Sequence, residues 1–405
     1  MKKNLRLVPF LKKIVECINR KDGYELSSML NVKNIHSSQL MNQISDPKHA
    51  KDLCMSNLPL NWNETVYYHL RALYLYQNGN VIDAATEQCN CAQNFHRIFS
   101  DLDRWALPLH YIIHSDLYYL SALADKELAE KNEKATKLED TARAINKAFT
   151  QCITDRRTPM TNSRKWGTYY IANLLFRTYF KLKSTNLCKN ILRAIKVGDM
   201  PELENFPVAQ QATFHYYCGL LNFLDEQYHE AGNHLLKAFR YIRGKSIKNE
   251  LIILHLLIPI RLLSGVLPSK NLLNYHSSIS ETYSGMINAI HSGNVKEFEH
   301  CLRKQEKVLI RHNTYLTIEK CKLLCMRRLF KKVYIIEGMP TRMDVDSFRH
   351  ALNFVAMNLD NDEVECLLAV MIEKGYIRGY ISHEKRVVVL SASNAFPDIT
   401  SISLA

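Results

Sequence analysis

Apolar residues recur with a period of about 3.6 from residue 5 to residue 337, and strict apolar/polar alternation is almost absent. This spacing is that of amphipathic helices, so it predicts a mainly α fold. Three segments share one pattern, in which an aromatic-rich helix, a tight polar turn and a second amphipathic helix follow one another. The turns are predicted at 78–80, 225–227 and 292–294, each followed closely by an apolar residue: Ala84, Ala231 and Phe298. Hairpins of this kind bury their apolar faces on their neighbours, which predicts a TPR-like stack.

The pattern changes after Gly338 and Pro340. One helix is predicted to start at Asp344, and a second runs from about residue 360 to Gly375. Two short apolar runs, 376–381 and 386–390, then flank the polar turn 382–385. A winged helix has its elements in this order: helix, short strand, helix, helix, strand, wing and strand. Such a domain can cap the open apolar end of a helical stack. A single long helix over 315–336 is expected to join the two parts.

These signals divide the chain into four parts. N-terminal helical repeats are expected at 1–205, further helices at 206–337, the winged helix at 338–397 and a tail at 398–405. Proline, glycine and aspartate predict loops at 44–63, 155–165, 197–210 and 264–270.

Several functional classes find no support in the sequence. The longest apolar run, 251–263, is interrupted by polar residues and is shorter than the ~20 residues that span a bilayer, so it predicts a buried helix and no membrane association. The eleven cysteines are odd in number and form no CxxC pair, which indicates reduced thiols. His110 and His114 have the spacing of a zinc pair, but Tyr111 stands where a zincin has its glutamate. No phosphate loop or nucleophile elbow is found, so neither catalysis nor a cofactor is expected.

Positive charge is concentrated in one part of the chain. The formal net charge is +13, and residues 141–196 hold twelve lysines and arginines against a single acid, Asp155. Such a surplus attracts polyanions, either nucleic acid or an acidic protein segment. A set of solvated helix faces is the alternative.

Six segments of the sequence resemble those of a known family. They are "DRWALPLHY" (103–111), "SRKWGTYYIANLLFRTYFKLKSTNLCKNILRAI" (163–195), "LLIPIRLLSGVLPS" (256–269), "RLFKKVY" (328–334), "GYIRGYISHEKRVVVLS" (375–391) and "NAFP" (394–397). Together with the helical stack and winged helix they resemble the PCI domain, and within it the PCI domain-containing protein two family. The signalosome-associated, twelfth-subunit-like proteins are close relatives.

The resemblance implies a non-enzymatic subunit. It would pair through its PCI domain with a large GANP-type scaffold, bind the small acidic protein shared with the proteasome lid, and help form a surface for RNA or DNA without sequence specificity. Such a subunit would act in nuclear mRNA export, including at nuclear pores, with the cytoplasm as a further location. A signalosome-associated role in mRNA processing or splicing is the alternative.

The charges of the winged helix argue against sequence-specific DNA reading. The first turn of its second major helix carries Asp360, Asp362, Glu363 and Glu365, which phosphates would repel. An autonomous DNA-binding regulator is therefore disfavoured. Basic residues elsewhere predict a rim that contacts phosphates without reading bases, with a solvated surface as the alternative: Arg327, Arg328, Lys331, Lys332, Arg342, Arg349, Lys374, Arg378, Lys385 and Arg386.

Two protein-binding surfaces are also predicted. Val387, Val388 and Val389 are expected to form an exposed edge strand that pairs with the PCI partner together with helix 345–357, unless the chain's own tail around Phe396 covers them. The small acidic protein is expected on a basic set that could instead touch RNA: Arg164, Lys165, Lys181, Lys183 and Lys189.

Overall fold

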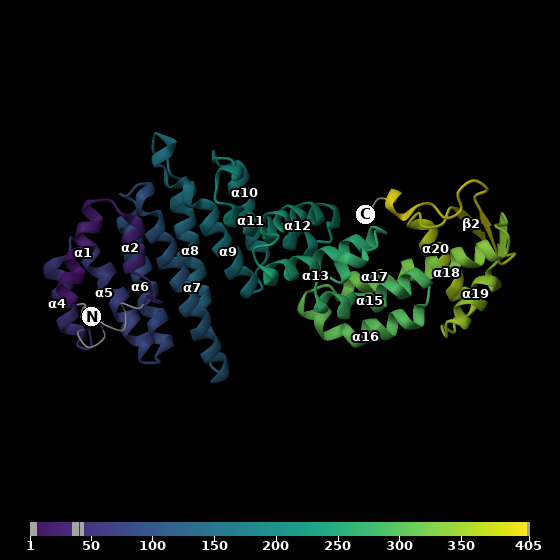
Figure 1. The fold of residues 1–405 in the computed structure, drawn as a ribbon, viewed down its shortest axis with the longest axis horizontal. Coiled ribbons are helices and arrows are strands. Elements are labelled where there is room, and N and C mark those ends of the chain that lie inside the picture. The colour runs from purple at the N-terminus through teal and green to yellow at the C-terminus, as the bar shows by residue number, and fades with distance from the viewer. Residues whose placement is uncertain (1–5, 35–39, 41–43, 403–405) are drawn as a thin grey trace. The chain divides into compact units, whose positions relative to one another are not determined.

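The computed structural model describes residues 6–34, 40 and 44–402. The chain divides into two compact units, Met1–Phe214 and His215–Ala405, which we call the N-terminal unit and the C-terminal unit. Both are mainly helical, and a small sheet lies near the C-terminus (Figure 1). The predicted mainly α fold, a stack of helical hairpins followed by a winged helix, is confirmed.

The N-terminal unit is mainly a series of helices, in which neighbours such as α5 and α6 are antiparallel and joined by a short turn (Figure 1). The α-helices are α1 (Leu7–Asn19), α2 (Gly23–Met29), α4 (Pro47–Asn57), α5 (Trp62–Gln77), α6 (Val81–Phe99), α7 (Leu107–Glu130), α8 (Lys137–Ile153), α9 (Thr168–Lys181), α10 (Asn186–Val197) and the start of α11 (Val208–Leu224). Short 3-10 turns lie between some of these helices, among the described residues: η2 (Arg104–Ala106), η3 (Met160–Asn162), η4 (Arg164–Gly167) and η5 (Leu203–Asn205).

The turn between α5 and α6 shows how the sequence closes a hairpin. Gly79 has φ +82°, a conformation that L side chains rarely adopt. The side chain of Asn80 then caps α6 by accepting the N–H of Asp83 at 3.2 Å. Ala84 is fully buried against α5, as its small size allows. The predicted turn at 78–80 is confirmed.

The loop prediction for 44–63 is wrong, because α4 occupies most of it. The Asp46 carboxylate accepts the N–H of Lys48 at 2.9 Å, and Pro47 lies in the first turn of the helix. Proline is favourable there, since the first N–H groups of a helix have no partner inside it. Pro47, a residue type that often ends a helix, thus begins one here.

The C-terminal unit continues the hairpins and ends in the winged helix. Its helical part comprises the end of α11, α12 (Tyr228–Ile242), α13 (Ile247–Leu263), α14 (Lys270–Leu273), α15 (Ser277–Ser292), α16 (Val295–Arg311), α17 (Tyr315–Lys320) and α18 (Lys322–Ile336). The turns at 225–227 and 292–294 lie where the sequence predicts them, and α13 is the expected buried helix. At Gly293, with φ +75°, an added Cβ would lie 2.9 Å from the backbone N of Leu329, so this turn packs directly on α18.

The single helix predicted over 315–336 is instead two helices, α17 and α18. The backbone N–H of Cys321 bonds to the carbonyl of Ile318, three residues back, at 2.9 Å. This 3-10 type hydrogen bond interrupts the i to i−4 hydrogen bonds of the α-helix at Cys321, which is fully buried.

The winged helix follows the predicted order of elements. It consists of β1 (Arg342–Asp344), α19 (Val345–Phe354), α20 (Asn361–Glu373), β2 (Gly379–Ser382) and β3 (Val387–Leu390), with a last 3-10 turn η6 (Ile399–Ser401) in the tail. The sheet is antiparallel with the order β1-β3-β2. Strand β2 begins at Gly379 rather than near residue 376, because the N–H groups of Tyr376 and Ile377 still bond to the carbonyl of Met371 at the end of α20.

The prediction of Val387–Val389 as an exposed edge is wrong. Strand β3 is the middle strand, since Met343 of β1 pairs with Val388 on one side and Ile381 of β2 pairs with it on the other. Val388 is completely buried. The outer strands of the sheet are β1 and β2.

Candidate interaction surfaces

Three of the acidic residues in the first turns of α20 stabilise the helix itself or its contact with the wing. Asp360 and Glu363 form a reciprocal capping box, with hydrogen bonds of 2.8 and 3.0 Å to each other's backbone N–H groups. Glu365 is 9% exposed and its Oε2 lies 2.6 Å from Nδ1 of His383, on the wing. This hydrogen bond, and then the charge of Glu365, raise the pKa of His383 above its ordinary value. The wing is therefore tied to α20 by an ion pair when His383 is protonated.

Arg327 does not belong to the predicted basic rim. It is 5% exposed, and its Nε donates to the carbonyl of Tyr376 at 2.9 Å. Its guanidinium also donates to the carbonyl of Pro397. Arg327 thus fixes the segments after α20 and β3 to α18, and a phosphate cannot reach it.

Two basic residues close to Arg327 donate hydrogen bonds to carbonyl groups at the C-terminal end of α15. Arg328 Nε donates to the carbonyl of His291 at 3.2 Å, and Lys332 Nζ donates to that of Ser292 at 2.6 Å. Cations there satisfy the last carbonyls of the helix and interact favourably with its dipole. Both side chains remain exposed, so they can contact a ligand at the same time.

The rest of the rim lies on the surface of the winged helix and α18. Arg349 is half-buried and paired with Asp346 at 2.7 Å. Six others form no side-chain hydrogen bond or ion pair with any described residue, and we call them the winged-helix basic set: Lys331, Arg342, Lys374, Arg378, Lys385 and Arg386. Lys331 is half-buried and the other five are exposed. These side chains are available for phosphates.

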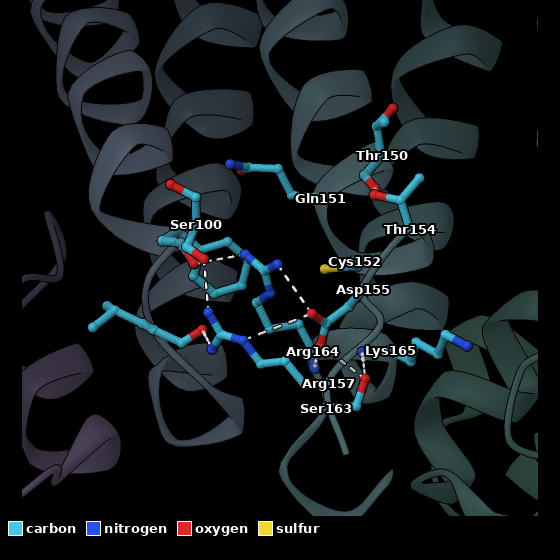
Figure 2. A network of polar contacts seen from close by, with 12 residues as sticks. Ser100, Thr150, Gln151, Cys152, Thr154, Asp155, Arg157, Ser163, Arg164 and Lys165 are labelled. Atoms are coloured by element: carbon cyan, nitrogen blue, oxygen red, sulfur yellow. Dashed lines mark hydrogen bonds and ion pairs between the residues drawn. The ribbon is translucent and has the colours of Figure 1, made fainter. Parts of the chain in front are cut away.

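In the N-terminal unit, Arg164 belongs to a structural network around Asp155 (Figure 2). Its Nη2 lies 3.1 Å from the Asp155 carboxylate, and Nη1 donates to the carbonyl of Phe99 at 2.8 Å. Arg157 donates to the carbonyls of Ser100 (2.7 Å) and Leu102, which also lie at and just after the end of α6. The two arginines thus hold the loop after α8 against the C-terminus of α6.

The electrostatics of Asp155 fit this structural role. Burial by itself would raise the pKa of this carboxyl, but three groups outweigh it: the backbone N–H of Arg164, the hydroxyl of Ser163 and the guanidinium of Arg164. The pKa is therefore lowered, and Asp155 remains charged near neutral pH.

Arg164 and Lys165 were predicted to bind an acidic partner, and the structure places both inside the N-terminal unit. Each side chain is 11% exposed. Lys165 Nζ donates to the backbone carbonyl of Asp199 at 2.5 Å. Of the predicted set, Lys181 and Lys183 are exposed and Lys189 is half-buried.

The histidines with zinc-like spacing are core residues. His110 and His114 are completely buried, and His114 Nε2 lies 2.9 Å from Nε2 of His96. Burial lowers the pKa of His114 to about 4. Over the described ranges, no group of three or more histidine, cysteine, aspartate or glutamate side chains is arranged to hold a metal ion. Likewise, no described helix is both long and apolar enough to span a membrane.

The sequence reasoning did not identify the exposed apolar residues of the winged helix. Phe354, at the end of α19, is 91% exposed, and Tyr380 on the outer strand β2 is 63% exposed. A signal was present for Phe354, since it falls outside the helical stripe of the buried residues Val345, Phe348 and Leu352. An exposed aromatic on an outer strand, as at Tyr380, is typical of a protein interface.

The fold and its C-terminal sheet define a PCI-domain protein, and the family model described as PCI domain matches residues 295–392. This range runs from α16 to just after β3. Proteins with this domain are generally non-catalytic scaffold subunits of larger complexes.

Comparison with curated proteins shows which family of PCI-domain proteins the chain belongs to. The Schizosaccharomyces pombe protein named Protein CSN12 homolog is 40% identical over 352 residues, which cover 83% of this chain and 83% of that protein. The Xenopus laevis PCI domain-containing protein 2 is 32% identical over 97% of this chain and 98% of its own length. The Drosophila melanogaster PCI domain-containing protein 2 homolog is 32% identical over 96% and 98%. The chain belongs to the family of PCI domain-containing protein 2 and the CSN12 homologs.

Proposed function

We propose that this chain is a non-catalytic subunit of a nuclear mRNA export complex, located in the nucleus and at nuclear pores. In this role it pairs through its winged helix with the PCI domain of a GANP-type scaffold and binds a small acidic protein. The two winged helices together present a basic surface to RNA or DNA without reading its sequence. The observation that carries the proposal is the winged-helix basic set, whose side chains form no hydrogen bond or ion pair with any described residue of a PCI-type domain.

Charge reversal of the wing tests the nucleic-acid surface. Lys385→Glu with Arg386→Glu, in the reconstituted heterodimer, should weaken single-stranded RNA binding about tenfold or more and reduce the log-log salt slope by roughly 1.4, as expected for two lost contacts to single-strand phosphates. The matched control is Lys304→Glu with Lys307→Glu, two exposed lysines of α16 outside the basic set. Equal affinity of the wing variant and the control variant would remove the wing from the nucleic-acid surface.

For the scaffold partner, we place the contact on β2 and Tyr380 in place of the buried strand β3. The outer strand offers unpaired backbone groups, and the exposed ring adds apolar area next to them. Tyr380→Asp should abolish co-purification with the scaffold while leaving the chain folded. Full recovery of the complex would exclude this surface.

For the acidic protein, we keep Lys181, Lys183 and Lys189 as the contact. Isothermal titration of the acidic protein and of RNA against a variant with these three lysines changed to glutamine separates the two ligands. Loss of binding to the acidic protein alone is the expected result. Loss of RNA binding alone would assign these lysines to nucleic acid.

A second candidate is a role in a signalosome-associated complex that acts in mRNA processing or splicing. It is favoured by the 40% identity to a protein named CSN12 homolog. Affinity purification from native extract with mass spectrometry decides between the two. A GANP-type scaffold among the partners supports the export complex, whereas signalosome or spliceosome subunits without that scaffold support the alternative.

A further inference from the structure

A groove of about 790 Å³ lies within the N-terminal unit, where α2, the starts of α7 and α11 and the turns η2 to η5 converge. Five aromatic side chains line it: Tyr24, Trp105, Tyr111, Trp166 and Phe206. It is remote in sequence from the winged helix and shares no residue with the surfaces discussed above.

Close backbone packing holds the walls of the groove in place. An added Cβ at Gly23 would lie 1.9 Å from the carbonyl oxygen of Trp105, so only glycine lets α2 approach this closely. The next residue, Tyr24, is 81% exposed. On the other side, Trp166 is fixed by its indole N–H, which donates to the carbonyl of Met160 at 2.9 Å.

One wall already shows how a guanidinium is held here. Arg104 lies with its Cζ 4.4 Å from the centre of the Trp166 ring, and its Nη1 donates to the carbonyl of Thr161 at 3.2 Å. A flat cation stacked on an indole, with its N–H groups directed to oxygens, is the arrangement that arginine favours over lysine.

Two acceptors in the lining lack a donor. The carboxylate of Glu204 is exposed and forms no ion pair or side-chain hydrogen bond with any residue that the structure describes. The side-chain oxygen of Gln210 is buried and has no hydrogen-bond partner in the same part of the chain. The other acid, Asp103, is already engaged by Lys21 at 3.7 Å and by the N–H of Trp105. With Asp103 and Glu204 against Arg104, the lining carries a formal charge of −1, whereas the whole chain carries +13.

We propose that this groove binds an arginine side chain presented by an exposed segment of a partner protein. The guanidinium would stack on Tyr24, the exposed ring of the lining, and donate to Glu204 and Gln210, which supplies the missing donors. Single-stranded RNA also stacks on aromatic rings, but its phosphates would be repelled by Glu204 and would leave both acceptors unpaired. The inference does not rest on the proposed export function.

Fluorescence anisotropy with the full-length chain tests this, using a labelled short peptide of alternating arginine and glycine. Since the chain is strongly basic, such a peptide is repelled by most of its surface, and binding isolates an acidic site. Glu204→Gln should weaken binding about tenfold, the loss expected for a charge-assisted hydrogen bond. Tyr24→Ala should weaken it about threefold through the lost stacking.

Glu202→Gln is the matched control, because Glu202 is an exposed glutamate at the start of the same turn and lies outside the groove. It should bind like the unmodified chain, and the lysine version of the peptide should bind several-fold more weakly. Equal affinities for all three variants, or for the two peptides, would overturn the proposal. So would loss of oligo-uridine RNA binding in Tyr24→Ala with peptide binding intact, which would make the groove a base-stacking site. Circular dichroism of each variant confirms that the fold is retained.

Discussion

Replacing Arg164 by glutamine distinguishes a structural residue from a partner-binding one. The sequence placed this arginine in a basic surface, whereas the structure uses it to join the loop after α8 to the end of α6 (Figure 2). If the structural role is correct, Arg164→Gln lowers the free energy of unfolding of the N-terminal unit. If Arg164 were a surface residue, the change would be close to zero.

The contacts of Arg164 determine how much the free energy of unfolding should fall. The substitution removes the ion pair with Asp155 and the charged hydrogen bond to the carbonyl of Phe99, and Asp155 has a side chain that is only 2% exposed. Breaking a buried ion pair costs about 3 to 5 kcal/mol. The lower end applies, because Asp155 keeps the hydroxyl of Ser163 at 2.9 Å and lies 3.9 Å from Arg157. We therefore expect a loss of about 3 kcal/mol.

Urea unfolding followed by tryptophan fluorescence provides the assay. All three tryptophans of the chain, Trp62, Trp105 and Trp166, lie in the N-terminal unit, so the signal reports on that unit. The control is Lys181→Gln, an exposed substitution expected to change the free energy by less than about 0.5 kcal/mol. Equal unfolding free energies for Arg164→Gln and Lys181→Gln would refute the structural role and return Arg164 to the candidate partner surface.

Two further predictions concern histidines. Burial lowers the pKa of His114 to about 4, against about 6.5 in an unfolded chain, so the unfolded state alone takes up this proton as the pH falls from 7 to 5. That uptake destabilises the fold by about 2 kcal/mol, and His114→Gln should make the fall in unfolding free energy between these pH values smaller by that amount; an unchanged pH dependence would contradict it. For His383, whose pKa is raised by Glu365, the contact stabilises the wing fully below about pH 6.5 and is lost as the pH rises through the raised value. An NMR titration should show a lower His383 pKa in Glu365→Gln, and identical titration curves would rule out the pairing.

The parts of the fold that were predictable depend on local signals. The hairpin turns at 78–80, 225–227 and 292–294 were found because polar residues or glycine interrupt a strong helical period there. The helix α4 is not apparent from the sequence because proline commonly ends helices, although Pro47, directly after the capping Asp46, lies at a helix start. The position of β3 in the sheet could not be read locally, since it depends on pairing with β1, a strand of only three residues far away in the sequence.

The candidate sites were harder to predict, because charge in a sequence does not reveal burial. Arg327 and Arg328 are adjacent, yet the first is enclosed by the segments around Tyr376 and Pro397 and the second is exposed. Their difference follows from the ~100° rotation per residue of a helix and from which face meets the winged helix. Only tertiary contacts decide which face that is.

The same reasoning changes the relative weight of the two basic regions. The stretch 141–196 has the larger charge surplus in the sequence, but Arg157, Arg164 and Lys165 direct their charges to carbonyls and carboxylates inside the N-terminal unit. Charges satisfied in this way attract an approaching polyanion less, because the neighbouring acids and dipoles offset their field. The side chains of the winged-helix basic set form no hydrogen bond or ion pair with any described residue. The smaller cluster in the sequence is therefore the stronger candidate for phosphates, whereas Lys181, Lys183 and Lys189 remain the proposed contact for the acidic protein.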